Sequence, residues 1–253
     1  TLLYTGVSPE VQCIATGSQD LVTWEKYSVN PVLASPPDHL DVVGFRDPCV
    51  WQDNGIWYMT LGTGIRGVGG AVLLYSSTDL RRWDYVSVLL AGDKNATGEM
   101  WECPSFFPLG DKYVLLISVL PRAGTYYFIG SFDGEHFTPE HQGTLDFGVH
   151  FFAPQTFLDA AGRRIMIGWL WESRSEEAQR SAGWAGIQSI PRQLTLHGRG
   201  GLGIEPVPEL RALRGEHSRW RDVVLSPTSD LDLHNVRGGC LEIIAEIEPG
   251  NAE

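Results

Sequence analysis

Short apolar runs with the length of β-strands dominate the chain, and helical periodicity is confined to two short stretches. Runs such as Ile56–Met59 and Tyr113–Ile117 are bounded by turn signals such as Asp53-Asn54-Gly55. The stretches with helical spacing are Glu176–Ala182 and Pro208–Arg214. The pattern therefore predicts an all-β fold.

A motif in which an acid is followed by a Cys/Pro pair and an apolar run occurs twice, and a third copy lacks the acid. The copies are Phe45–Trp51, Trp101–Phe107 and Phe152–Phe157. Each is followed by a turn signal and a second apolar run. Counting from Asp47 to Glu102 to Ala153 gives spacings of 55 and 51 residues. The third copy has Ala153 in place of the acid, so the repeated structure does not require an acid there. This favours a functional role for Asp47 and Glu102.

A second repeated signature predicts tight turns between antiparallel strands. Its copies are Gln19–Trp24, Thr78–Trp83 and, more weakly, Phe132–Phe137, each with an aromatic residue that caps the turn. Repeats of about 50 residues with four short strands are typical of propeller blades. We place Asp47 and Glu102 at the start of the innermost strands of consecutive blades, so we expect their carboxyl groups to meet at the channel mouth.

The composition changes after Arg192, where a Gly-rich stretch and the Pro-rich linker Glu205–Glu209 follow. We expect one domain over residues 1–207 and, over residues 208–253, a linker and the first strands of a different all-β module. The apolar runs Val223–Leu225 and Leu241–Ile247 are its predicted strands.

The charge and the cysteine pattern exclude several classes of function. The chain has 253 residues and a net charge of −12, which argues against nucleic acid as a partner. No apolar run approaches the length that spans a membrane. The four Cys form no CxxC pair and the His show no ligand spacing, so we expect no disulfide framework, metal or other cofactor.

Neither terminus resembles a natural one, so we expect the chain to be a fragment. It begins with a strand-like run that has no lead-in, and no initiator Met or signal peptide is visible. Secreted and cytoplasmic locations therefore both stay open. The sequence does not indicate an oligomeric state.

Glu102 has the features of a general acid. It lies between Trp101 and Cys103, where loss of hydration is expected to raise its pKa towards neutrality. Paired carboxylates at the mouth of an aromatic channel suit glycoside hydrolysis, in which sugars lie on flat aromatic faces. Arg46 is expected to bind sugar hydroxyls and to keep Asp47 ionised. Candidate aromatic platforms are Trp101, Phe151, Phe152, Trp169, Trp171 and Trp184.

Each of these features also has a purely structural interpretation. Glu102 could simply open a buried strand and find a local partner there. Packing between blades is the better interpretation for most of the aromatic residues, including Trp51, Trp57 and Trp83. Glu172, Glu176 and Glu177 lie in a polar stretch that we expect to be exposed and away from the channel.

Arg46-Asp47-Pro48 and Trp101-Glu102-Cys103-Pro104 resemble the two signature motifs of glycoside hydrolase family 32, which contains invertases, fructanases and levanases. Further similar segments, in the same order, are Phe151–Phe157, Ile167–Trp169 and Trp184–Arg192. The resemblance implies a five-bladed β-propeller, with the first blade incomplete or missing here, followed by the start of a β-sandwich. It also implies retaining hydrolysis of terminal β-D-fructofuranosides, with sucrose or fructans as substrates.

The resemblance assigns roles to residues of this sequence. Glu102 matches the acid/base and Asp47 the stabiliser of the transition state. The positions that shape the fructose pocket are Arg46, Cys103, Asp146, Phe152 and Trp169.

Departures from the family pattern bear on activity and on substrate preference. The family's nucleophile is the first Asp of a Trp-Met-Asn-Asp-Pro-Asn-Gly motif, which does not occur here, so we expect it to lie outside this chain. Phe152 stands where a Tyr is usual, and His150 and Ser105 stand where relatives often have Asp. The sequence does not distinguish sucrose, sucrose phosphate, inulin and levan as substrates.

Two other functions stay open at this point. One is a five-bladed propeller hydrolase acting on arabinose- or xylose-containing glycans, although such relatives lack the Glu-Cys-Pro motif. The other is a carbohydrate-binding propeller without activity, in which the acids bind only hydroxyl groups. An Asn-Asp-Pro-Asn-Gly motif in the upstream gene sequence would favour the fructoside hydrolase, and its absence would favour the binding protein.

Overall fold

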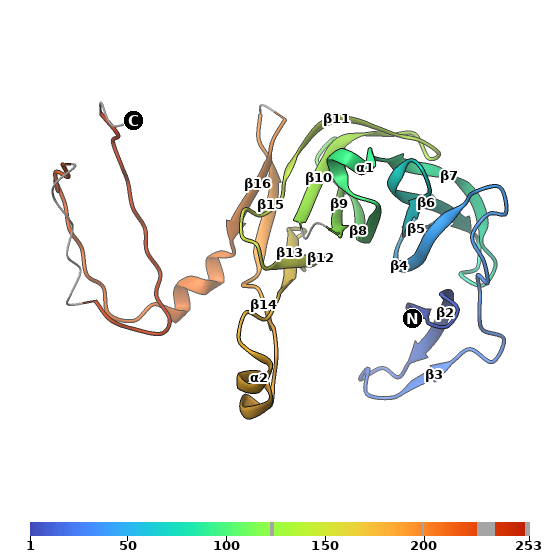
Figure 1. Ribbon diagram of the computed structural model, residues 1–253, viewed down its shortest axis with the longest axis horizontal. Coiled ribbons are helices and arrows are strands. Elements are labelled where there is room, and N and C mark those ends of the chain that lie inside the picture. Colours follow the sequence, from blue (N-terminus) through green and yellow to red (C-terminus); the bar gives the residue numbers. More distant parts are fainter. Residues whose placement is uncertain (122–123, 199, 227–235, 251–253) are drawn as a thin grey trace. The chain divides into compact units, whose positions relative to one another are not determined.

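The computed structural model describes residues 1–121, 124–198, 200–226 and 236–250. The chain divides into two units, Thr1–Pro206 and Val207–Glu253. All strands of the described residues belong to the first unit, where they form four antiparallel sheets (Figure 1). The fold is therefore all-β with a four-blade propeller arrangement. The all-β class and the propeller were predicted, and the five-bladed form stays a prediction.

The first three sheets are meanders of strands that follow one another in the sequence. The first, in the order β1-β2-β3, consists of β1 (Leu2–Gly6), β2 (Val11–Gly17) and β3 (Trp24–Lys26). The second consists of β4 (Val42–Asp53), β5 (Ile56–Ile65), β6 (Gly69–Ser77) and β7 (Asp84–Ala91). The third follows the short helix α1 (Lys94–Thr97) and consists of β8 (Met100–Leu109), β9 (Lys112–Leu120), β10 (Gly124–Phe132) and β11 (Phe137–Thr144).

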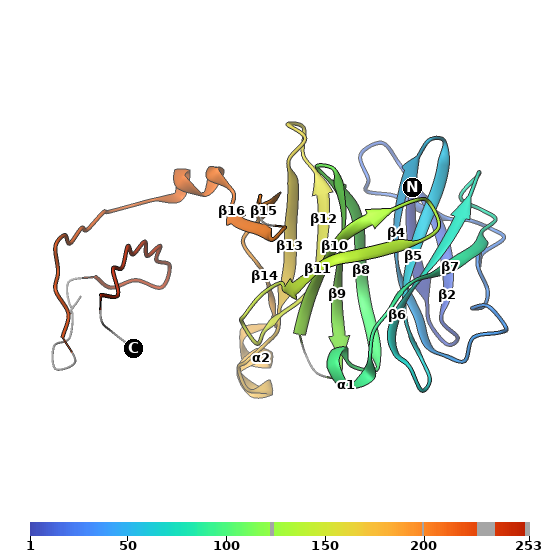
Figure 2. The ribbon, with the colours of Figure 1, turned by 90° about the horizontal axis from the view of Figure 1, so that it is seen from above.

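The fourth sheet has the order β12-β13-β15-β16, with β14 paired to β13. Its strands are β12 (Phe151–Leu158), β13 (Arg164–Leu170), β14 (Ile187–Gln188), β15 (Arg192–Leu196) and β16 (Leu202–Pro206). Helix α2 (Glu176–Ala182) lies in the excursion between β13 and β14 and coincides with one of the two predicted helical stretches. Figure 2 shows the sheets of this unit side by side, with β12 next to β8.

Three apolar cores join the four sheets in pairs. Strand β9 shows how alternation builds two of them: Leu115 and Ile117 pack towards the second sheet, whereas Val114 and Leu116 pack towards the fourth. The third core holds the first sheet against the second around Phe45. Burial of apolar side chains between neighbouring sheets is the main source of stability expected for such a stack.

The predicted turn signature is confirmed in its two stronger copies. The indole Nε1 of Trp24 donates to the carbonyl of Leu21 at 2.9 Å, and Trp83 repeats this bond to Leu80 at 3.1 Å. By this correspondence, β2 and β3 match β6 and β7, so β1 matches β5. The described residues of the first sheet therefore contain no counterpart of the innermost strand β4.

The same β-bulge interrupts the innermost strand of the second, third and fourth sheets. Two residues on that strand face one on its neighbour, and a residue with left-handed backbone lies inside each bulge. These residues are Asp47, Cys103 and Ala153, with φ angles of 63°, 49° and 50°. Each donates its amide hydrogen to the preceding sheet, to Thr5 Oγ1, Asp47 Oδ2 and Ser118 Oγ respectively.

The bulge corrects the register that we derived from the sequence. Asp47 is equivalent to Cys103 rather than to Glu102, and Glu102 is equivalent to Arg46, 56 residues earlier. Asp47 also lies inside β4 rather than at its start. The repeat was aligned on the acidic residue, whereas the backbone aligns on the residue before the proline. Asp47 is therefore the left-handed residue of the bulge in β4, whereas Glu102 directly precedes the left-handed residue of the bulge in β8.

The second unit is described by itself. It begins with the 3-10 helix η1 (Pro208–Leu213), which matches the predicted helical stretch. Its other described residues, 214–226 and 236–250, contain no strand, and Val224 and Ile247 are exposed. An apolar run becomes a strand only when a neighbour supplies hydrogen bonds, and within the described part of this unit Val223–Leu225 and Leu241–Ile247 are not paired as strands. The β-sandwich stays a prediction.

Gly62 allows β8 to approach β5 closely enough to place Glu102. A Cβ at position 62 would lie 2.4 Å from the carbonyl oxygen of Trp101 and 3.3 Å from the Cα of Glu102. We expect Gly62→Ala to lower the free energy of unfolding by about 1–3 kcal/mol, because the backbone of β8 must move. Denaturant unfolding followed by tryptophan fluorescence measures this loss.

Gly201→Ala provides the control for this prediction. A Cβ at position 201 has nothing within 4 Å, so the substitution is expected to change the free energy of unfolding by less than about 0.5 kcal/mol. Equal stability of the two variants would show that β8 does not depend on the missing side chain.

Candidate active site

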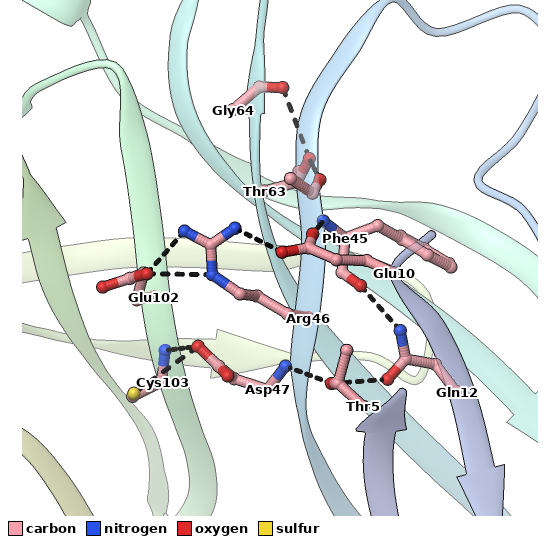
Figure 3. A network of polar contacts seen from close by, with 11 residues as sticks. Thr5, Glu10, Gln12, Phe45, Arg46, Asp47, Thr63, Gly64, Glu102 and Cys103 are labelled. Carbon is pink, nitrogen blue, oxygen red and sulfur yellow. Dashed lines mark hydrogen bonds and ion pairs between the residues drawn. The ribbon is translucent and has the colours of Figure 1, made fainter. Parts of the chain in front are cut away.

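Two hydrogen-bonded ties connect the bulge of β4 with that of β8 (Figure 3). In the first, the guanidinium of Arg46 donates from Nε and Nη2 to Oε1 of Glu102, at 2.8 and 2.5 Å. In the second, the amide of Cys103 donates to Oδ2 of Asp47 at 2.9 Å. Four of the seven predicted site residues are thus brought together, and the two pairs lie at the junction of the second and third sheets.

Glu10, which the sequence analysis did not identify, belongs to the same network. It ends the turn between β1 and β2, and it accepts from Arg46 Nη1 at 2.9 Å and from the amide of Phe45 at 2.5 Å. Arg46 thus lies between two carboxylates (Figure 3). Glu10 belongs to neither repeated motif, so no pattern in the sequence indicated it.

The surroundings of the two predicted acids differ from those expected. We predicted apolar neighbours for Glu102, but its carboxylate is paired with Arg46 and its side chain is 17% exposed. Arg46 was expected to act on Asp47, whereas its ion pairs are with Glu102 and Glu10. The one-residue shift in register explains both differences, because it places Arg46 opposite Glu102 and Asp47 opposite Cys103.

At Arg46 the effect of the neighbouring carboxylates on the pKa outweighs the effect of burial. Burial by itself would lower the pKa of Arg46, but the hydrogen bonds and charge of Glu102, with smaller effects of Glu10 and Asp47, raise it overall. The guanidinium of Arg46 thus forms ion pairs with Glu102 and Glu10, and its charge also interacts with Asp47. Such a cluster can bind hydroxyl groups and stabilise a developing positive charge.

Cys103 is held as a neutral thiol. Burial raises its pKa well above the ordinary value, and the charge of Asp47 adds to this effect. Its Sγ lies 3.5 Å from Oδ2 of Asp47, so the S–H group and the amide of the same residue both donate to one carboxylate oxygen. A thiol in this state orients Asp47 and is a poor nucleophile.

An aromatic group lies at the equivalent position of the fourth sheet. Phe152 occupies the place that Arg46 and Glu102 hold in their blades, and it is 5% exposed. Its ring contacts Trp171, with centroids 5.0 Å apart, and Trp171 contacts Trp169. Trp169 is 47% exposed, which leaves area on it for a ligand.

Two of the candidate sugar platforms are buried in the cores instead. Trp101 is fully buried, donates to the carbonyl of Thr97 at 2.8 Å and packs between the second and third sheets. Phe151 packs in the core between the third and fourth sheets. The packing interpretation is thus correct for these two, and also for Trp51, Trp57 and Trp83.

Asp146 lies in a separate ion pair. Its carboxylate accepts from Nη1 of Arg192 and from the amide of Gly148, and the guanidinium of Arg192 covers the ring of Phe151. These contacts join the connection after β11 to the fourth sheet. Among the described residues, none of its hydrogen bonds or ion pairs links Asp146 to the cluster around Arg46.

Two acids of the excursion around α2, Glu172 and Glu176, form ion pairs with nearby arginines. Hydrogen bonds from Arg174 are the main cause that lowers the pKa of Glu172 to about 2. Glu176 is exposed and pairs with Arg180. Exposure was expected for Glu172, Glu176 and Glu177, and it holds for Glu176 and Glu177 but not for Glu172, whose side chain is 14% exposed.

The described residues contain no group of three or more His, Cys, Asp or Glu that could hold a metal ion. No helix among them is long and apolar enough to cross a membrane.

Comparisons with known proteins agree on one group of enzymes. The model of the glycosyl hydrolases family 32 N-terminal domain matches residues 1–206. The chain is 37% identical to a sucrose-6-phosphate hydrolase of Escherichia coli over 82% of its own length, and 33% identical to a levanase of Bacillus subtilis over 96%.

Solved structures support the same relationship. A mutant β-fructofuranosidase of Bombyx mori in complex with sucrose superimposes with a TM-score of 0.73 at 34% identity, over 85% of this chain and 49% of that one. Fructan 1-exohydrolase IIa of Cichorium intybus in complex with 1-kestose gives a TM-score of 0.74 at 30% identity, over 85% and 46%. The chain covers 44% and 38% of the E. coli and B. subtilis enzymes, so it spans about half the length, or less, of the relatives named here.

Proposed function

Because the chain belongs to glycoside hydrolase family 32, we propose that it carries part of the active site of a retaining β-fructofuranosidase. The whole protein would release terminal β-D-fructofuranosyl units from sucrose or fructans. The pair of ties that joins Arg46 to Glu102 and Asp47 to Cys103 carries this proposal. It places an acid, a second carboxylate and a cation at one junction between blades.

In this proposal Glu102 is the acid/base. It protonates the oxygen of the departing sugar, and in the second step it removes a proton from the attacking water. Arg46 contacts it through two hydrogen bonds and thereby orients its carboxyl group.

Asp47 is proposed to stabilise the transition state. Its Oδ2 is engaged with the amide and thiol of Cys103, which fixes the orientation of the carboxylate. The other oxygen is then available for fructose hydroxyls, whose hydrogen bonds strengthen as positive charge develops on the ring.

The remaining predicted site residues are proposed to shape the pocket. Phe152 offers a ring in place of a hydroxyl-bearing tyrosine, and Trp169 offers the exposed face on which a second sugar could lie. Asp146 would act through Arg192 and the fourth sheet, because its contacts lie there.

The substrate class follows from the relatives' names. The structural neighbours hold sucrose and 1-kestose, and the sequence relatives are a sucrose-6-phosphate hydrolase and a levanase. All of these substrates present a terminal fructofuranosyl unit. The hydrolase of arabinose- or xylose-containing glycans and the binding protein without activity are not favoured by any of these relatives.

The nucleophile is proposed to lie outside these 253 residues, in a longer protein. Retaining hydrolysis needs a second carboxylate about 5–5.5 Å from the acid/base. Asp47 is assigned another role, and Glu172 is held by Arg174. The first sheet, whose described residues lack an innermost strand, is the place where a further strand would bring the nucleophile to the channel.

The test of the proposed function uses the full-length protein encoded by the gene. We expect fructose release from sucrose, 1-kestose or levan, and no release of pentose from arabinosides or xylosides. Reaction in the presence of methanol distinguishes the mechanism, because retention gives methyl β-fructofuranoside and inversion gives the α-anomer. Binding of these sugars without hydrolysis would instead establish the non-catalytic alternative.

We expect Asp47→Asn in the full-length protein to lower kcat more than it raises KM. The neutral amide still binds fructose hydroxyls, but it loses the charge that acts as the oxocarbenium-like transition state forms. Steady-state kinetics with sucrose measures both constants. An effect confined to KM would make Asp47 a simple binding residue.

A further inference from the structure

We propose that Glu10 is a positioning residue for this reaction, which holds Arg46 in place and limits the share of its positive charge that acts on Glu102. The inference rests on the proposed function, because it assigns Glu10 a task towards the acid/base. Neither repeated motif includes Glu10, and its contacts are the only indication of its role.

Glu10 fixes Arg46 at both ends. Its Oε2 accepts from the amide of Phe45, next to the backbone of Arg46, and its Oε1 accepts from Nη1 at the tip of the side chain. A carboxylate that spans backbone and guanidinium in this way leaves the arginine little rotational freedom. The side chains of Glu10 and Arg46 are 29% and 25% exposed, so solvent screens this pair only in part.

The rest of the first sheet supports the same short segment of β4. Gln12 is fully buried, and its Nε2 donates to the carbonyl of Phe45 at 2.7 Å. Its Oε1 accepts from Thr5 Oγ1, which in turn accepts from the amide of Asp47 at 3.0 Å. Phe45, Arg46 and Asp47 are therefore all held from the first sheet (Figure 3).

The charges around Glu102 explain why a second carboxylate is useful there. Among the described residues, Arg46 and Asp47 face it from β4, Cys103 lies beside it on β8, and Glu10 reaches it through Arg46. Its partner on β9 is Ser118, which accepts from the amide of Ala153 on β12, and Gly62 of β5 lies next to its backbone; none of these three residues titrates. Arg46 is thus the one cation of this group, and Glu10 competes with Glu102 for it.

This competition matters because Glu102 changes its charge during each turnover. When Glu102 carries the proton that it donates, it is a weaker partner for a guanidinium, and Arg46 would otherwise be free to turn away. Glu10 stays available as a partner and keeps Arg46 in place until the proton has left. It also weakens the electrostatic effect by which Arg46 favours the ionised form of Glu102, so that Glu102 keeps its proton until the proton is transferred to the leaving sugar.

The test is the pH dependence of kcat in the full-length protein with Glu10→Gln. The glutamine keeps the size of the side chain and one of its two acceptor oxygens but removes the charge, so it can accept from Phe45 or from Arg46 but not from both. Arg46 then acts on Glu102 alone and favours its ionised form, so the alkaline limb of the profile is expected to move about one pH unit lower. On that limb the rate falls about tenfold, while the acidic plateau and KM change little.

Matched variants separate this effect from a loss of structure. Glu140→Gln also removes one carboxylate from an ion pair, with Lys112, and it is expected to leave the profile unchanged. Glu10→Asp keeps the charge but withdraws it from Arg46, so its alkaline limb is expected to lie between those of the wild type and Glu10→Gln. If Glu10→Gln does not fold, the shift in Glu10→Asp decides the question.

The result that overturns the proposal is an alkaline limb that stays in place. A rate lowered equally at every pH would show that Glu10 has only a structural role. Glu102→Gln measured in the same buffers distinguishes the two levels of inference. If that variant is inactive while Glu10→Gln keeps the wild-type limb, the proposed function stands and the role of Glu10 falls. If Glu102→Gln hydrolyses sucrose normally, Glu102 is not the acid/base and the role of Glu10 towards it falls as well. If the full-length wild type releases no fructose from sucrose or fructans, the proposed function itself falls.

Discussion

Replacing Glu102 by glutamine in the full-length protein is expected to lower kcat for sucrose by about 10²–10⁴, because the leaving sugar no longer receives a proton. The amide can still accept hydrogen bonds from Arg46, so the junction between β4 and β8 is expected to persist. Steady-state rates of fructose release measure the loss, and circular dichroism measures the fold.

The leaving group provides the control for this prediction. In an aryl fructoside with an acidic phenol, the phenolate leaves without needing a proton. Glu102→Gln is therefore expected to slow the fructosylation step of this substrate far less than that of sucrose. Near-normal hydrolysis of sucrose by the folded variant would show that Glu102 serves only the packing of its strand and the ion pair with Arg46.

The second large effect concerns the 253-residue chain purified on its own. We expect no measurable hydrolysis of sucrose or fructans, because the residues proposed for catalysis include an acid and a stabiliser but no nucleophile. Glu172 is the best enclosed acid of the α2 excursion, yet Arg174 and the amide of Gly186 occupy its oxygens. Release of fructose is measured beside the full-length protein under the same conditions.

A rate within tenfold of the full-length protein would contradict this prediction. It would require a substitute nucleophile within these residues, and Glu172→Gln and Glu176→Gln would then be the first variants to test. Binding of fructose or sucrose by the isolated chain would not contradict it, since Asp47 and Arg46 are both present.

Much of the fold could be predicted from periodicity and repetition. Apolar runs such as Tyr113–Ile117 became strands buried on both faces, and the turn signature correctly indicated the contacts of Trp24 and Trp83. These features depend on neighbours in sequence, so a local pattern carries them. The stretch Glu176–Ala182 is predictable for the same reason, because its caps, Ser175 and Gly183, are local.

The register of the site could not be obtained in this way. Aligning the motifs on the acids made Asp47 equivalent to Glu102, whereas the left-handed residue of each bulge is Asp47 or Cys103. A bulge adds one residue to one strand only, and this shifts every later position by one relative to its neighbour. The sequence shows which residues precede a proline, but it does not show which residue of each strand is left unpaired with the neighbouring strand.

Contacts between segments that are far apart in the chain could not be predicted from the sequence either. Glu10 is an acid in a turn and looks like any solvated residue until the first sheet packs on β4. In the second unit, Leu241–Ile247 has a strand-like composition, but without a hydrogen-bonding neighbour among the described residues it does not form one. In both cases the outcome depends on the partner and not on the segment.

The ties of the candidate site have a consequence for the order of folding. Gln12, Glu10, Thr5 and Cys103 reach their partners in β4 across 33 to 56 residues, whereas the first three sheets are meanders whose hairpins close over short loops. Contacts between near neighbours form early, because closing a long loop costs more chain entropy. The blades can therefore assemble individually, and the charged cluster comes into being only when they dock. A nascent chain would carry formed hairpins well before it could bind sugar.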